Sequence, residues 1–320
     1  MSVMEDKNIY ELVIIGGGPA GCGAAVYAAR KQIKTLMILN YWGGQSAVSM
    51  DIQNWIGTKH ISGQELAKNL KDHVLEYQGE TLKIKENSLV KNISKSQEND
   101  RERIFEVELE NSTEKFLAKS ILIATGSQRR RLGIKGADLF EHKGLTYCAT
   151  CDGPLFAKKD MIVVGGGNSA FEAAAQLLAY AKSVTLVAMN KIKADPIMVH
   201  QLSKDPKFKI IENATPREVY GEKFVTGLTY LNNLTKEEIK LKAEAIFVEI
   251  GQIPVTDFAK NICEISPDKK IKIDPLTQRT SQLGIWAAGD CTNVLYHQNN
   301  IAVGDGVKAI ENIYQYLKTR

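Results

Sequence analysis

The sequence predicts an α/β protein of two three-layer units, each built on a parallel sheet, with the second unit inserted into the first. A short apolar strand, a glycine-rich turn and an alanine-rich helix follow one another near the N-terminus, and this succession returns in mid-chain. The two turns begin at Gly16 and Gly165, about 150 residues apart, so the pattern is a repeat. A strand ending in glycine stands on either side of the second copy, at Gly126 and Gly251. Together these observations indicate two Rossmann-like units.

Length and composition fit a globular protein with two cores. The chain has 320 residues, of which 44% are hydrophobic and 24% charged, a length typical of about two domains. Its 41 basic residues nearly balance 37 acidic ones, which is too even for a nucleic-acid-binding protein. No apolar run in the sequence approaches the length of about 18 residues that a membrane helix needs. The polar N-terminus does not resemble a signal peptide. We therefore predict a cytoplasmic protein that binds neither nucleic acid nor membrane.

The first copy of the repeat has the features of a dinucleotide site. An apolar strand over 10–15 leads into the turn 16–21, a helix over 24–30 and a second strand over 35–39. Gly16 permits the tight turn, Gly18 lets the backbone approach a pyrophosphate, and Gly21 allows close helix packing. The N-terminus of the helix then stabilises the phosphate charge.

The second copy has a strand over 161–164, a helix over 171–180 and a strand over 184–187. Gly165, Gly167 and Ala170 form its GxGxxA turn. Nucleotide-binding copies carry an acid about 20 residues further on, or arginines for a 2′-phosphate. The stretch 187–193 has neither, and the first copy has Asn40 where its acid is expected. An asparagine can bind a ribose hydroxyl, although without the charge of a carboxylate.

The remaining patterns set the domain boundaries. Strands over 121–126 and 246–251 mark the two crossings, and a strand and turn over 284–290 precede an amphipathic helix over 303–316. We predict one domain over 1–126 and 251–320, and an inserted domain over 127–250.

Five cysteines are few for this length, and Cys22, Cys263 and Cys291 stand alone. This distribution does not fit a secreted disulfide framework and favours a reducing compartment. The other two, Cys148 and Cys151, form a CxxC motif.

The CxxC motif has three interpretations. A zinc half-site needs a second cysteine pair, which the sequence lacks, so no metal site is predicted. Two unrelated buried cysteines are uncommon at this spacing. A redox-active pair fits best, because one sulfur can attack while the other leaves. The adjacent Asp152 would move a proton to or from a thiolate, or cap the next turn. A dithiol beside two dinucleotide folds suggests a flavin that passes two electrons to a disulfide.

Six motifs in order resemble the low-molecular-weight thioredoxin reductase family, and still more the flavoprotein reductase domain of bacterial alkyl hydroperoxide reductase. They lie at 16–21, 43–45, 124–126, 148–156, 165–168 and 288–292. The similarity covers essentially the whole chain, with no thioredoxin-like domain before it, so a stand-alone reductase is expected.

The resemblance implies an FAD site in the first domain and a nicotinamide nucleotide site in the second. The predicted FAD contacts are Gly16, Gly18, Pro19, Ala20, Gly21, Asn40, Gly44, Gln45, Asn54, Ala124, Thr125, Gly126, Gly289, Asp290, His297, Gln298, Asn299 and Ala302. The predicted nicotinamide nucleotide contacts are Gly165, Gly167, Asn168, Ser169 and Ala170.

By the same resemblance, Cys151 faces the flavin, Cys148 attacks the partner disulfide, and Asp152 is the acid–base group. The family implies a homodimer and a thioredoxin- or glutaredoxin-like partner. Because its dithiol lies on the inserted domain, dithiol and nicotinamide must take turns at one flavin face.

The electron donor is where the chain departs from the family pattern. NADPH-specific members carry a basic cluster where this chain has Ala188, Met189 and Asn190, with Lys193 the one basic residue at a matching position. NADH-using members carry a glutamate at the place of Ala188. NADPH is therefore disfavoured and NADH is favoured. Two alternatives stay open: the same disulfide chemistry driven by ferredoxin or a deazaflavin, and a non-catalytic, FAD-bound redox sensor or partner-binding module.

Overall fold

The computed structural model of the protein describes residues 9–49, 51–98 and 103–319. The N-terminal residues in which we predicted no signal peptide lie outside this range. The chain divides into two compact units. The first consists of Met1–Val48, Trp55–Gln128 and Ile253–Arg320, and the second of Ser49–Asn54 and Arg129–Gln252. The divisions at 128 and 252 fall two residues after those predicted. Ser49–Asn54, assigned to the first domain from the sequence, groups with the second unit; no strand or helix pattern in these residues could indicate which unit they join.

The first unit is built on a sheet with the strand order β3-β2-β1-β6-β5-β4, and β17 also pairs with β6. The strands β1, β2, β3, β6 and β17 run parallel, whereas β4 and β5 are antiparallel. Its elements are β1 Ile9–Ile15, α1 Pro19–Arg30, β2 Thr35–Ile38, η2 Gly44–Val48, α2 Gly63–Leu75, β3 Leu82–Lys85, β4 Val90–Glu98, β5 Arg103–Leu109, β6 Lys115–Ile123, η4 Asp257–Ala259, β17 Ile285–Ala287 and α7 Asn299–Lys318.

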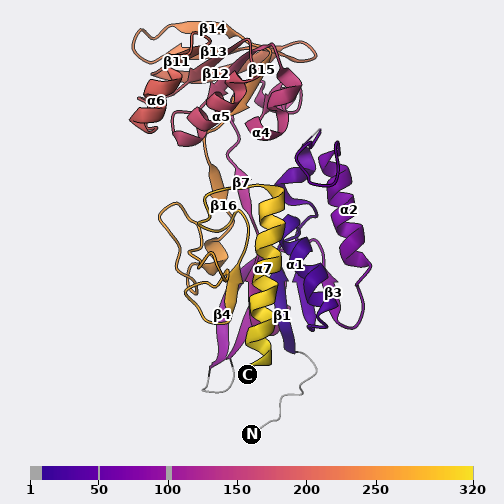
Figure 1. Ribbon diagram of the computed structural model, residues 1–320. Helices are drawn as coiled ribbons and strands as arrows, with labels where there is room; N and C mark the ends of the chain where they lie inside the picture. The colour runs from indigo at the N-terminus through magenta and orange to yellow at the C-terminus, as the bar shows by residue number, and fades with distance from the viewer. Residues whose placement is uncertain (1–8, 50, 99–102, 320) are drawn as a thin grey trace. The chain divides into compact units, whose positions relative to one another are not determined.

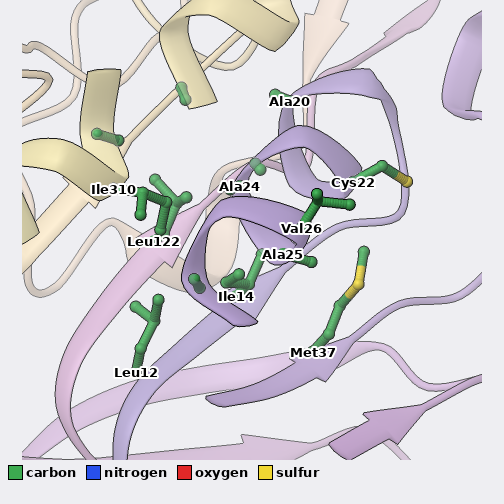
Figure 2. Packing of buried hydrophobic residues seen from close by; sticks show 14 of the residues in the cluster. Leu12, Ile14, Ala20, Cys22, Ala24, Ala25, Val26, Met37, Leu122 and Ile310 are labelled. Carbon is green, nitrogen blue, oxygen red and sulfur yellow. The ribbon is translucent and has the colours of Figure 1, made fainter. Parts of the chain in front are cut away.

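Alternate residues of β1 face two different layers, as the period of a strand requires. Leu12 and Ile14 pack against α1 and α7, while Val13 and Ile15 face a cluster from β4, β5 and the segment 258–273. Helices α1 and α7 lie side by side along the sheet (Figure 1). Small residues such as Ala24 bring α1 close to Ile14 and Leu122 (Figure 2).

The second unit repeats the arrangement with a parallel sheet in the order β11-β10-β9-β15-β8. One face packs on α4, α5 and α6, and the other on the antiparallel strands β12, β13 and β14 (Figure 1). Its elements are α3 Ala137–Phe140, β8 Leu145–Thr146, α4 Ala149–Asp152, η3 Gly153–Phe156, β9 Asp160–Val164, α5 Asn168–Leu178, β10 Ser183–Val187, α6 Pro196–Leu202, β11 Phe208–Ile211, β12 Ala214–Gly221, β13 Val225–Asn232, β14 Glu238–Lys242 and β15 Ala245–Val248.

The chain passes between the units in two segments that pair with each other. These are β7 Ser127–Arg129 and β16 Gln252–Pro254. Among the described residues, no helix combines the length and apolar character that crossing a membrane requires. The parallel strands in the sheet of each unit, with their covering layers, confirm the predicted α/β fold class.

Candidate active site

The predicted FAD contacts of the first unit gather at the carboxyl ends of its parallel strands. Gly16 N–H donates to Ile38 O at 2.8 Å, Ala124 N–H to Ile15 O at 2.8 Å, and Ala288 N–H to Ile123 O at 2.9 Å. The turns after β1, β6 and β17 therefore begin in one row. This edge of an open parallel sheet is where such folds bind ligands.

Of the three motif glycines, Gly16, Gly18 and Gly21, two are required by the packing of the protein itself. A Cβ on Gly16 would lie 2.2 Å from Ala124 O, and one on Gly21 would lie 2.0 Å from Gly16 O. A Cβ on Gly18, by contrast, would meet nothing nearer than Gly44 Cα at 3.8 Å. The packing of the protein would therefore tolerate a side chain at residue 18. A glycine there is expected if a pyrophosphate approaches the backbone.

The N-terminus of α1 suits an anion. Gly18 is its N-cap and Pro19 its first residue, and no side chain caps its free N–H groups. The first turn of α1 carries no acidic residue that would repel a phosphate. The helix therefore offers backbone donors and the positive end of its dipole to a phosphate. These features fit the pyrophosphate of FAD.

The N-terminus of α7 closes the other side of this edge. Its N-cap is Gln298, also without a side-chain cap. A Cβ on Gly289 would lie 3.3 Å from Ala20 Cβ and 3.5 Å from Ala302 Cβ, so the turn after β17 touches the beginnings of α1 and α7. Ser46 Oγ donates a hydrogen bond to Asn299 Oδ1 at 2.5 Å. This bond links η2, which contains Gly44 and Gln45, to the N-terminus of α7.

Two predicted contacts need separate mention. Asn54 groups with the second unit. His297 is half-buried, with Nε2 at 3.2 Å from Val294 O. The roles assigned to them from the resemblance stay predictions.

The second glycine turn follows β9 in the same way. Gly165 N–H donates to Val187 O at 3.0 Å, and a Cβ on Gly165 would lie 2.3 Å from Glu249 O. A Cβ on Gly167 would meet nothing within 4 Å. Gly167 is the N-cap of α5 and no side chain caps that helix. The turn therefore also leaves room for a phosphate at a helix N-terminus.

The two cysteines of the CxxC motif form a disulfide in the second unit. Cys148 and Cys151 are bonded, with their Cα atoms 5.3 Å apart. Cys148 lies two residues beyond the end of β8 and is the N-cap of α4. Its Sγ accepts a hydrogen bond from Cys151 N–H at 3.2 Å. Both residues are partly exposed. This arrangement places a reducible disulfide at the surface of the unit.

Asp152 follows Cys151 directly in the chain and is half-buried. Burial raises the pKa of its carboxyl, and this effect exceeds the opposing hydrogen bond from Thr146 Oγ1 to Oδ2 and the charges of Arg129 and His142. Asp51 raises the pKa further. Within the described chain, Asp152 Oδ1 is buried without a hydrogen-bond partner. A carboxyl that keeps its proton to a higher pH than usual can serve as an acid.

Sequence reasoning missed two residues that affect these sites. Thr146 binds Asp152, but no motif links positions six residues apart. Glu249 follows β15 next to Gly165, and burial raises the pKa of its carboxyl to about 7, with Arg129 opposing the shift and Glu172 adding to it. The sequence signal that could have indicated Glu249 is that it is the one acidic residue in the otherwise apolar run 246–250.

The three cysteines outside the CxxC motif are packed in the protein interior. Cys22, Cys263 and Cys291 are buried and unbonded. Burial raises the pKa of the Cys22 thiol to about 12 and those of Cys263 and Cys291 to about 11. Such thiols stay protonated and unreactive at neutral pH.

The pyridine nucleotide-disulphide oxidoreductase family model matches residues 10–306. The chain belongs to this family. Membership implies FAD and a nicotinamide as cofactors, and it confirms the predicted class of FAD-dependent disulfide oxidoreductase.

Three relatives illustrate the similarity. The thioredoxin reductase of Streptococcus pyogenes shares 32% identity and a TM-score of 0.89, covering 98% of this chain and 99% of that one. An NADH dehydrogenase of Ferdinandcohnia aciditolerans is 36% identical over 99% of this chain and 59% of its own length. An alkyl hydroperoxide reductase component from Pseudomonas aeruginosa is 37% identical over 97% of this chain and 59% of its own length. The predicted resemblance is thus confirmed, and the chain spans about three fifths of the length of these two sequence relatives.

Proposed function

We propose that the chain uses bound FAD to pass two electrons from NADH to the Cys148–Cys151 disulfide, and from the resulting dithiol to a thioredoxin- or glutaredoxin-like protein. The observation that carries the proposal is the partly exposed disulfide with a half-buried carboxyl of raised pKa beside it. When bound, FAD supplies two-electron exchange between a nicotinamide and a sulfur.

In the proposed reaction, the Cys148 thiolate attacks a sulfur of the partner disulfide, and the other partner sulfur leaves as a thiolate. Cys151 then attacks the mixed disulfide, which reforms the Cys148–Cys151 bond and releases the reduced partner. The Cys151 N–H that points at Cys148 Sγ would stabilise the attacking thiolate. Asp152 would hold the proton that the leaving thiolate takes up.

The cofactor residues keep the roles assigned from the resemblance. The uncapped helices α1 and α7 and the bare Gly18 support FAD at the carboxyl edge of the first sheet. The uncapped helix α5 supports a nicotinamide nucleotide at Gly167. NADH as donor is supported by the name NADH dehydrogenase of a relative and by the lack of arginines at 187–193.

A pair of cysteine variants tests the dithiol. Cys148→Ser should bind FAD and accept electrons from NADH, yet lose reduction of a thioredoxin disulfide. Cys263→Ser, a buried cysteine outside the motif, is the matched control and should keep both. Retained disulfide reduction in Cys148→Ser would overturn the assigned role.

A donor comparison tests the source of electrons. Under anaerobic conditions, NADH should bleach the flavin faster than NADPH, reduced ferredoxin or a reduced deazaflavin. Fastest bleaching by ferredoxin or deazaflavin would replace NADH with that donor. Equally slow bleaching by all four, without disulfide reduction, would instead indicate a redox sensor. The predicted homodimer is tested separately by light scattering.

A further inference from the structure

The loop after β10, residues 189–195, folds over the second glycine turn. Lys193 N–H donates to Gly166 O at 2.8 Å, and Asp195 N–H donates to Asn168 Oδ1 at 2.8 Å. Ile192 Cδ1 lies 3.8 Å from where a Cβ on Gly166 would be. The loop thus borders the place where the adenosine ribose of a nucleotide lies in such folds.

The position that usually supplies the ribose acid has no polar side-chain atom here. Ala188 is 1% exposed, and its Cβ lies 3.2 Å from where a Cβ on Gly166 would be. Ala188 therefore lies beside the glycine turn, but its side chain cannot accept a hydrogen bond from a ribose hydroxyl.

Glu212 follows β11 directly and places its carboxylate on the loop after β10. Ala188 N–H donates to Ile211 O at 2.9 Å, and Ala214 N–H donates to Ala188 O at 2.9 Å. Glu212 lies between these two contacts in the chain and therefore runs alongside Ala188. Glu212 Oε1 accepts the Ile192 N–H at 2.7 Å. In the described chain its Oε2 has no hydrogen-bond partner, and the side chain is exposed.

The loop near this carboxylate offers two lysines and no arginine to a phosphate. Lys191 and Lys193 on the loop are not buried, and lysine binds a phosphate as a flexible point charge rather than with the fork of an arginine. Asp195 uses its carboxylate to cap α6 at Ile197 N–H. A 2′-phosphate placed at this edge would therefore meet the negative charge of Glu212.

We propose that Glu212 is the specificity-determining residue for the electron donor: it accepts the adenosine ribose hydroxyls of NADH and repels the 2′-phosphate of NADPH. This inference rests on the proposed nicotinamide donor and deepens it. In this proposal the ribose acid follows β11 instead of β10. The usual sequence spacing between the glycine turn and the acid therefore does not predict Glu212.

The test measures binding without turnover. ADP-ribose and 2′-phospho-ADP-ribose lack the nicotinamide and cannot reduce the flavin, so calorimetric titration of the FAD-loaded chain reports the adenosine site alone. The unaltered protein should bind ADP-ribose more tightly. Glu212→Gln keeps an acceptor for Ile192 N–H and removes the charge, and it should reduce this preference about tenfold. Glu212→Lys should reverse it.

Two further variants separate recognition from support of the loop. Glu222→Gln, an exposed glutamate on the β12–β13 turn, should leave the preference unchanged. If Glu212→Ala weakens both ligands equally while Glu212→Gln changes nothing, Glu212 only anchors the loop and the inference is wrong. Failure of the unaltered chain to bind either ligand would contradict the nicotinamide donor itself, whereas a preference that ignores position 212 contradicts only the role of Glu212.

Discussion

The half-buried carboxyl of Asp152 owes its expected chemical role to its surroundings. Burial raises its pKa, and Thr146 holds one of its oxygens while the other stays unpartnered among the described residues. The sequence shows an acid next to the dithiol, but only the fold reveals the burial and the contact with Thr146.

Replacing this carboxyl should slow proton transfer without disturbing the disulfide. We expect Asp152→Asn to reduce thioredoxin reduction by about 100-fold, a typical loss for an acid–base group, with FAD binding unchanged. Because the pKa of Asp152 is raised, its acid form persists above the usual pH range of a carboxyl. The fall in rate as the pH rises through that pKa should disappear in the variant. A variant with the same pH profile as the unaltered enzyme would show that another group carries the proton.

Glu249 makes a prediction about stability. Its pKa is about 7 in the folded chain against an ordinary 4.5, so between these values the folded state holds a proton that the unfolded state has lost. Stability should therefore fall as the pH rises across this window, by on the order of 2 kcal/mol. Denaturant unfolding at pH 5 and pH 8 should show this loss in the unaltered chain and a smaller one in Glu249→Gln. The exposed Glu222→Gln is the control, and an equal loss in the unaltered chain and Glu249→Gln would refute the assignment.

At the scale of elements, the two strand–turn–helix repeats were predictable from periodicity and glycines alone. The predicted helix over 24–30 begins too late, since α1 begins at Pro19. The first turn of α1 contains a motif glycine, and glycine is not typical of a helix interior. Likewise α7 begins at Asn299, several residues before the amphipathic pattern from 303. The antiparallel strands β12–β14 were not predicted, since their residues carry no chemical motif.

The glycines of the first turn separate folding from ligand binding. Gly18→Ala should leave the unfolding temperature of the FAD-free chain nearly unchanged, because its Cβ would make only an ordinary contact with Gly44 Cα at 3.8 Å. It should weaken FAD binding at least about tenfold, because the Cβ would keep a pyrophosphate from the backbone. Gly21→Ala should destabilise the fold by about 2 kcal/mol or more, since its Cβ would overlap Gly16 O. Thermal unfolding with and without FAD measures both. Unchanged FAD affinity in Gly18→Ala would contradict a pyrophosphate at this turn.

At the scale of the whole molecule, each unit has its own sheet and its own buried clusters. The insertion could be predicted because the sequence repeats its signature between two matching strands. The membership of Ser49–Asn54 in the second unit and the carboxylate of Glu212 beside Ala188 could not, because both depend on contacts between distant segments that carry no local pattern.

Separate cores predict separate responses to a ligand. Calorimetry of the FAD-free chain should show two unfolding transitions, and added FAD should raise mainly the one belonging to the first unit, since a ligand stabilises only the state that binds it. A single transition that FAD shifts as a whole would mean that the units unfold together.

Electron exchange between the flavin and the Cys148–Cys151 disulfide is tested most directly by anaerobic titration of the FAD-loaded chain with dithionite. The unaltered chain should take up about four electrons, two for FAD and two for the disulfide, and Cys148→Ser about two. Uptake of two electrons by both proteins would contradict the exchange.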